Sequence, residues 1–227
     1  MKDILDKWCG SIWLYCLYGI GIIMLINMLI RWSGWETPQK VMGIMCVLLP
    51  LHVFEENTWP GGFPYMNNRA FGSPEPMICP QNRVTNMWTN LGAELIYIVF
   101  LLLTPIFPEA LMVNIVVFAL MQCVIHTRSG AVMYKLYKDK GKRTIYGPGS
   151  ITSYIGLAPL AVYALSWLVS SGAEVRDMLL GIISILIIVI TMILIPFRIS
   201  SRIRSARFAL TDNSIVMGVK EPKQGLI

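Results

Sequence analysis

The sequence predicts an all-α membrane protein, a bundle of about six transmembrane helices. Of its 227 residues, 55% are hydrophobic and only 14% are charged, and the mean hydropathy is +0.60. Soluble domains carry about 25% charged residues, so this chain has too few charges to cover a water-facing surface. Several charge-poor stretches reach the roughly 20 residues that cross a bilayer. This composition excludes an intrinsically disordered protein. It also excludes a nucleic-acid-binding domain, although the net charge of +6 alone would be compatible with one.

Six apolar stretches define the expected helices. They cover residues 8–30, 41–54, 87–107, 109–126, a span within 146–173, and 178–196. The second stretch is short and contains Pro50, so we expect its helix to continue through Glu55 and Glu56 or to bend. Asp3 and Asp6 precede the first stretch and no small-residue cleavage site follows it, which predicts a retained helix instead of a signal peptide.

The expected organisation is one transmembrane domain over residues 1–197, followed by a basic cytoplasmic tail over 198–227. Between the second and third helices, residues 57–86 are rich in Pro, Gly and Asn. Such a composition predicts turns. A long segment of this kind in a compact protein is typical of a binding loop, so we expect a re-entrant or cytoplasmic lid.

The distribution of basic residues predicts the orientation in the membrane. Six spans place both termini on one side, and 16 of the 19 Lys and Arg residues fall on that side; the exceptions are Arg31, Lys40 and Arg176. Basic residues accumulate in cytoplasmic loops, so both termini are expected in the cytoplasm. The five cysteines are dispersed without a CxxC pair, which predicts neither a disulfide framework nor a zinc knuckle.

Five ionisable side chains fall within or beside the expected helices, where each costs about 2.5–3.5 kcal/mol on insertion scales. They are His52, Glu55, Glu56, Glu94 and His126. A helix presents positions i, i+3 and i+4 on one face, which is the spacing of His52, Glu55 and Glu56. Asn90 precedes Glu94, and Gln122 precedes His126, by four residues each. With the expected topology, all of these groups lie at the cytoplasmic side of the bundle.

The segment His52-Val53-Phe54-Glu55-Glu56 resembles the motif of the HXXEE family of bacterial membrane proteins. Pro60-Gly61-Gly62-Phe63, His126 and Pro148-Gly149 are similar to the rest of that family's pattern, from about Val41 to Ala173. The resemblance implies a site that contains His52, Glu55, Glu56 and His126, and a bacterial cytoplasmic membrane as the location. It implies no particular reaction, because the family has no settled activity.

The composition of the polar cluster favours a metal-dependent membrane enzyme, a hydrolase or an isomerase. The expected ligands of zinc or iron are His52, Glu56, Glu94 and His126, since imidazole and carboxylate are the donors that these metals use. The catalytic acids and bases would be Glu55, Glu56 and Glu94. Four further residues are expected to contact the substrate or the ligands: Asn90, Gln122, Tyr146 and Arg69. Arg69 or Arg83 would meet an anionic head group of a lipid-like substrate.

Two other interpretations stay open. A metal-free isomerase or cyclase, or an intramembrane glutamate-type hydrolase, would use a buried carboxyl group as acid or base. A transporter, or a non-enzymatic immunity or partner protein, is the second alternative. A transporter is disfavoured because the sequence shows no internal repeat and its polar groups lie near one side of the membrane. The sequence leaves the substrate, the metal and the oligomeric state open.

Overall fold

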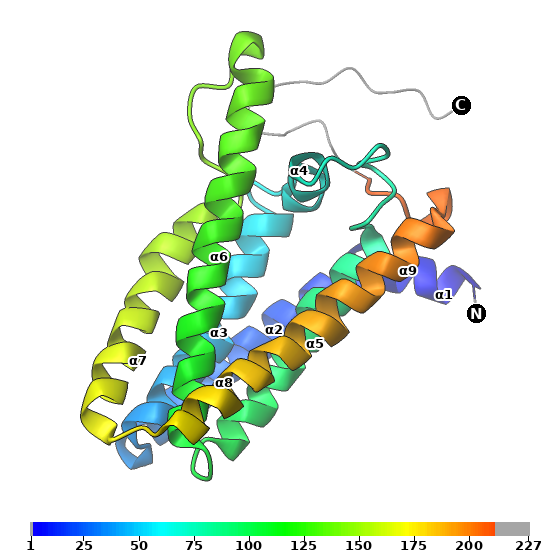
Figure 1. Cartoon of the computed structure of the whole chain (residues 1–227). Coiled ribbons are helices and arrows are strands. Elements are labelled where there is room, and N and C mark those ends of the chain that lie inside the picture. Colours follow the sequence, from blue (N-terminus) through cyan, green and yellow to red (C-terminus); the bar gives the residue numbers. More distant parts are fainter. Residues whose placement is uncertain (1, 212–227) are drawn as a thin grey trace.

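The protein, seen in a computed structural model that describes residues 2–211, is a bundle of helices (Figure 1). Those residues contain no β-strand. Six helical segments are long and apolar enough to cross a membrane: Ile4–Gly34, Thr37–Asn57, Arg83–Leu103, Pro108–Lys140, Thr152–Ser171 and Val175–Ile203. The predicted all-α class with six candidate spans is therefore confirmed.

Most of the helices follow one another with short connections, and longer segments precede α5 and the fifth span. Their bounds are α1 (Lys2–Lys7), α2 (Trp13–Arg31), α3 (Thr37–Asn57), α4 (Phe63–Ala70), α5 (Arg83–Leu103), α6 (Pro108–Tyr137), α7 (Ala158–Ser171), α8 (Val175–Ile188) and α9 (Ile195–Ile203). Wider π-helical turns continue three of the spans without a break, at Trp8–Ile12 before α2, Thr152–Leu157 before α7 and Val189–Leu194 between α8 and α9.

Side chains that cap the backbone fix the start of the two helices that hold most of the polar residues. At α3, the Glu36 backbone N–H donates to Gln39 Oε1 over 3.0 Å, and Pro38 occupies the first turn. At α5, Asn82 Oδ1 accepts from the N–H groups of Val84 and Thr85, both at 3.0 Å. Such capping boxes satisfy backbone donors that a helix start leaves unpaired, so the start residue is defined.

The main core lies where α2, α3, α5, α6 and α7 pack together, and it is rich in methionine. Met42, Met45 and Met112 are fully buried in it. The absence of a side chain at Gly21 brings α2 close to α3, because a Cβ there would lie 2.8 Å from Pro50 Cβ. The proline expected to bend the second helix is thus packed inside a helix that runs to Asn57.

The segment 57–86 differs from the expected loop of turns. It contains α4, whose side chains Phe63 to Asn68 are all buried, and Phe63, Tyr65 and Met66 form a second core with Met133 and Tyr137 of α6. The sequence pattern did not predict this eight-residue helix, because the high Pro, Gly and Asn content of the segment indicates turns. The expected tail 198–227 begins as the last turns of α9, and its residues 212–227 lie outside the described residues.

Helix α6 packs on α8, whereas α9 packs on α5. Figure 1 shows α8 packed on α6 at one end of the bundle, while α9, which continues α8, leans away from α6 toward the other end. The short helix α4 lies at that second end, between α6 and α9. His52 precedes the end of α3 by five residues, which corresponds to about 8 Å along the helix axis.

Candidate metal centre

Three buried side chains from two helices meet at one point. His52 and Glu56 lie one turn apart on α3, with His52 Nε2 3.4 Å from Glu56 Oε1. His126 comes from α6, and its Nε2 atom lies 3.3 Å from Glu56 Oε1 and 3.3 Å from His52 Nε2. The three side chains are 1%, 4% and 0% exposed. The spacing that the sequence predicts on α3 is therefore present, and α6 supplies its partner.

The separation of these atoms matches the geometry of a tetrahedral metal site. Zinc binds imidazole nitrogen and carboxylate oxygen at about 2.0–2.2 Å, so two ligands at tetrahedral corners are separated by about 3.3 Å. The three observed separations are 3.3, 3.3 and 3.4 Å. Among the described residues, these three side chains are the group of His, Cys, Asp and Glu donors close enough to share one ion.

A hydroxyl group determines the tautomer of His52. Thr152 Oγ1 lies 2.6 Å from Glu55 Oε2 and 2.7 Å from His52 Nδ1. A threonine hydroxyl has one proton, which it donates to the carboxylate, so it accepts the second hydrogen bond from His52 Nδ1–H. The proton of the neutral ring is then on Nδ1, and the lone pair of Nε2 points to the meeting point of the three ligand atoms.

Glu55 is held at the start of the fifth span instead of at the meeting point. Its Oε1 atom accepts hydrogen bonds from Tyr146 Oη and the Ile151 N–H, both at 3.1 Å. Its Oε2 atom accepts from Thr152 N–H at 2.8 Å, in addition to the threonine hydroxyl. A carboxylate at a helix N-terminus pairs with free backbone N–H groups and with the positive end of the helix dipole. Glu55 therefore orients Thr152 and, through it, His52.

Tyr146 supports this arrangement as a hydrogen-bond donor. Burial, together with the negative charge of Glu55, raises the pKa of the Tyr146 phenol above its ordinary value. The phenol stays protonated at neutral pH, so it donates to Glu55 and does not act as a base.

Close packing by Phe63 and Gly149 fixes the ring of His126. The Phe63 ring lies on one side with its centroid 4.5 Å away. The backbone of Gly149 lies so close that a Cβ there would come within 2.1 Å of His126 Cε1. His126 Nδ1 is buried and has no hydrogen-bond partner among the described residues. Contacts, and not a second hydrogen bond, therefore orient this imidazole.

The meeting point opens onto a large, mainly apolar cavity. Its volume is about 580 Å³, within the range of small-molecule sites. His52 and Glu56 form part of its wall, together with apolar side chains of α4, α6 and the α8–α9 span. Four amide side chains also line it: Asn67, Gln81, Asn90 and Gln122. The exposed Arg198 of α9 is the basic residue of the lining.

The structure brings three of the four predicted ligands together and places the fourth apart. Glu94 is fully buried on α5, neither of its oxygens has a hydrogen-bond partner among the described residues, and it is not part of the three-residue group. It also does not line the cavity, whereas Asn90, one turn earlier, does. Gln122 likewise lies at the cavity and not at the meeting point.

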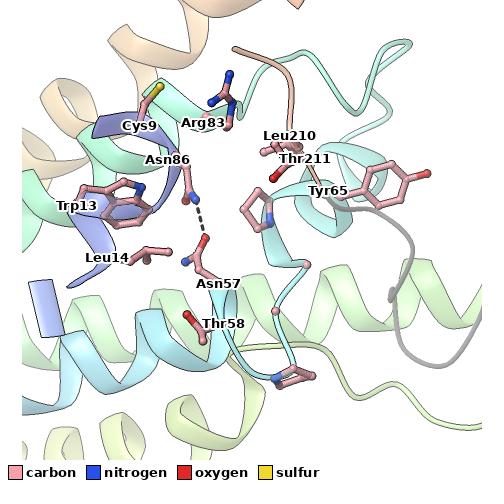
Figure 2. Close-up of a pocket in the computed structure, with 15 residues that line it drawn as sticks. Cys9, Trp13, Leu14, Asn57, Thr58, Tyr65, Arg83, Asn86, Leu210 and Thr211 are labelled. Carbon is pink, nitrogen blue, oxygen red and sulfur yellow. Dashed lines mark hydrogen bonds between the residues drawn. The ribbon is translucent and has the colours of Figure 1, made fainter. Parts of the chain in front are cut away.

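The two arginines considered for head-group binding lie elsewhere. The Arg69 guanidinium is 3.4 Å from Tyr137 Oη, and Arg69 does not line the cavity. Arg83 lines a separate pocket of about 160 Å³, shown in Figure 2. Residues within 9–14, 57–65 and 210–211 form this pocket together with the start of α5. The Arg83 guanidinium donates to the carbonyl groups of Asp6, Arg207 and Ala209.

Sequence reasoning missed three residues that shape the site: Asn67, Thr152 and Arg198. Phe63 and Gly149 lie in the stretches that resemble the family pattern, but their contacts with His126 were not predicted. For Thr152 there was a signal, because a Ser/Thr-containing stretch follows Pro148-Gly149 at the start of an apolar span, where hydroxyl groups form caps. Contacts that join residues more than 70 positions apart could not be predicted, because no local sequence pattern indicates them.

Comparison with known proteins agrees with the motif at this site. The family described as "Protein of unknown function with HXXEE motif" matches residues 43–164, more than half of the chain. The chain belongs to the HXXEE family. The matched range contains all three residues of the meeting point and the Thr152 that orients His52. The named residues of the HXXEE motif therefore make two different sets of contacts. His52 and Glu56 face the meeting point, and Glu55 faces Thr152. No curated protein and no solved structure matches the chain.

Proposed function

We propose that the protein is a zinc-dependent membrane enzyme that acts on a lipid-soluble substrate held in the 580 Å³ cavity. The observation that carries the proposal is the convergence of His52 Nε2, His126 Nε2 and Glu56 Oε1, each 3.3–3.4 Å from the others, at the wall of that cavity. Two histidines and one glutamate form a known catalytic zinc set, in which the fourth position is left for water or substrate.

The donor set favours one zinc ion over two iron ions. Di-iron bundles use several carboxylates, with a Glu-x-x-His pair on each of two helices. Here one carboxylate lies at the meeting point, because Glu55 is engaged by Tyr146, Ile151 and Thr152 and Glu94 lies apart. A single ion needs no further carboxylate.

The roles of the chain's own residues follow from their contacts. Zinc would supply Lewis-acid polarisation of a substrate oxygen. His52, His126 and Glu56 would hold the ion, and Glu55 with Thr152 would keep His52 in the binding tautomer, as outer hydrogen-bond partners do in zinc sites. The apolar wall would exclude bulk water and accept the chain of a substrate that arrives from the bilayer. The positive-inside distribution supports a location in the cytoplasmic membrane, with the site at the cytoplasmic side.

The test is the metal content of the purified protein in detergent, wild type beside Glu56→Gln. We expect about one equivalent of zinc in the wild type and little in Glu56→Gln, because the amide is neutral and a weaker ligand. Glu94→Gln is the matched control, since it makes the same change at another buried carboxyl group and should retain zinc. Equal zinc in Glu56→Gln and wild type, or none in the wild type after reconstitution, would contradict the proposal.

The enzymatic part needs a second readout. Wild type and Glu56→Gln are each incubated with a bacterial lipid extract, and lipid masses and chromatographic retention times are compared before and after chelation of zinc. Retention times are included because an isomerisation does not change the mass. A change in either quantity that requires both Glu56 and zinc supports the proposal. Unchanged masses and retention times with fully loaded wild type would contradict the activity while leaving the metal site in place.

One alternative uses the same atoms. Glu56 Oε1 lies within 3.4 Å of both imidazoles, so a proton shared among the three groups would serve metal-free acid–base chemistry on the same substrate. That alternative becomes the leading proposal if the wild type binds no metal and still changes lipid masses or retention times in a Glu56-dependent manner.

A further inference from the structure

We propose that the cavity binds an apolar-chain molecule whose polar end donates hydrogen bonds, such as a long-chain alcohol or amide, in preference to a phosphorylated lipid. This inference names the substrate class of the site and rests on the proposed function for that role. The binding preference itself requires only the cavity. The preference follows from a series of hydrogen-bonded amide side chains that ends at the cavity wall. The donor and acceptor of each bond in this series determine which atom the last residue leaves unpaired.

The chain of hydrogen-bonded amides begins at a backbone carbonyl group, which can only accept a hydrogen bond. The Val53 carbonyl oxygen, inside the family motif, lies 3.1 Å from Asn57 Nδ2. A carbonyl offers no proton, so Asn57 donates with its amide nitrogen and turns its Oδ1 the other way. This first contact fixes which end of Asn57 is the nitrogen.

Each later link inherits that direction. Asn57 Oδ1 accepts from Asn86 Nδ2 at 2.5 Å, the bond drawn between α3 and α5 in Figure 2. Asn86 Oδ1 in turn accepts from Gln81 Nε2 at 3.1 Å. Gln81 Oε1 then accepts from Asn67 Nδ2 at 3.2 Å. Because each amide gives its nitrogen to the preceding residue, the last residue presents an oxygen.

That last oxygen is an unused acceptor on a residue that lines the cavity. Asn67 lines the cavity and is only 7% exposed. Its Oδ1 atom is buried and has no hydrogen-bond partner among the described residues. The backbone of Gln81 is itself fixed by Asn68, which exchanges two hydrogen bonds with it over 2.9 and 2.7 Å. The acceptor is therefore held in place by the protein.

Asn90 adds a second acceptor to the same wall. Its Nδ2 atom donates to both the backbone oxygen of Asn86, at 3.0 Å, and Asn86 Oδ1, at 2.9 Å. Both amide protons are used, so the Oδ1 atom of this residue, which is 8% exposed and lines the cavity, is left to accept.

Two acceptors determine the polar chemistry of the ligand: the buried Asn67 Oδ1 and the Asn90 Oδ1, which both lack a donor among the described residues. A hydroxyl group donates its one proton to one of them and a primary amide can donate to both, whereas an ether donates to neither and a phosphate oxygen faces them with negative charge. The apolar remainder of the lining suits a hydrocarbon chain. Arg198 is exposed at the lining, which makes a phosphorylated chain the competing ligand for the test.

The experiment compares three probes with one chain: hexadecanol, hexadecyl methyl ether and hexadecyl phosphate. Their binding to zinc-free protein in detergent is measured by native mass spectrometry at equal mole fractions. We expect the alcohol to bind about tenfold more tightly than the ether, the effect of one buried hydrogen bond, and more tightly than the phosphate. Asn67→Leu should lower the preference for the alcohol over the ether, and Asn67→Leu combined with Asn90→Leu should remove it.

The matched control is Asn114→Leu. Asn114 is also a fully buried amide, but it accepts from Tyr97 Oη and donates to Ser184 Oγ, and it does not line the cavity. This variant should keep the wild-type preference. Equal binding of alcohol and ether to the wild type, tighter binding of the phosphate, binding of none of the probes, or an unchanged preference in Asn67→Leu would overturn the inference. Because the protein is zinc-free throughout, a failure of the zinc proposal does not alter this result.

Discussion

The Nε2 atoms of His52 and His126 lie 3.3 Å apart, although 74 residues separate them in the sequence. The two rings are perpendicular, with centroids 4.9 Å apart. Since His52 uses its Nδ1 proton on Thr152, its Nε2 lone pair is directed at a second imidazole nitrogen and at a carboxylate oxygen. His126 Nδ1 has no partner among the described residues, so this ring either carries its proton on Nε2 and donates to Glu56, or leaves Nε2 free to bind a metal ion together with His52 and Glu56.

The first prediction concerns the hydroxyl that links Glu55 to His52. Thr152→Val keeps the shape of the side chain but removes the hydroxyl and with it the hydrogen bonds to Glu55 and His52. The His52 ring then loses the partner that fixes its tautomer, and we expect zinc affinity to fall about 10- to 100-fold. The measurement is a zinc titration against a competing chelator. Thr152→Ser, which retains the hydroxyl, should restore most of the affinity; equal affinity in Thr152→Val would contradict the role assigned to the link.

The second prediction separates backbone strain from contact with His126. Gly149 and Gly141 have φ angles of +91° and +101°, so alanine is strained at both, by about 1 kcal/mol. Only at Gly149 would the new Cβ collide with the imidazole, since nothing lies within 4 Å of a Cβ at Gly141. We expect Gly149→Ala to displace His126 and abolish zinc binding, and Gly141→Ala to lower the melting temperature slightly with zinc retained. Metal content and thermal unfolding of the two variants decide the matter, and retained zinc in Gly149→Ala would count against the arrangement.

The third prediction is a pH dependence of stability. Lys142 is 4% exposed, its Nζ donates to the Tyr146 carbonyl at 2.9 Å, and burial lowers its pKa to about 8. In the unfolded chain the pKa of lysine is about 10.4. Between these values the unfolded state binds more protons than the folded state, so the free energy of unfolding rises as the pH increases from 8 to 10.

Lys142→Met isolates this contribution, because it keeps an unbranched side chain and removes the titrating group. The melting temperature of each protein is measured in steps from pH 7 to pH 10. The difference between variant and wild type should be largest at pH 7 and shrink toward pH 10. A difference that is constant over the range would show that Lys142 does not titrate there.

Much of the fold could be predicted because each span is a local property of the chain. Length and hydropathy define the six helices, and the i, i+4 spacing places His52 and Glu56 on one face of α3. The pairing with His126 could also be inferred, since charge counting placed it at the same membrane side.

The different contacts of Glu55, with Thr152, and of Glu56, with the two histidines, could not be predicted. Adjacent residues on a helix point about 100° apart, but the sequence does not show which of the two directions meets α6 and which meets the start of the fifth span. The helix α4 was also missed, because its eight residues gain their stability from packing on α6, which no local pattern records. The amide chain from Asn57 to Asn67 joins three separate segments and left no spacing to detect.

The last prediction concerns Arg83, which the sequence suggested as a head-group ligand. Its Nε and Nη2 atoms donate to the carbonyls of Ala209 and Arg207 at 3.0 and 2.6 Å. Arg83→Met removes these bonds, so we expect the segment that follows α9 to separate from α5 and trypsin to cleave after Arg204 and Arg207 several-fold faster. Zinc content and alcohol binding should not change. The control is Arg176→Met, at an exposed position in the first turn of α8, which should leave cleavage at the wild-type rate. Unchanged cleavage in Arg83→Met, together with weaker binding of hexadecyl phosphate, would instead return Arg83 to the role of a head-group ligand.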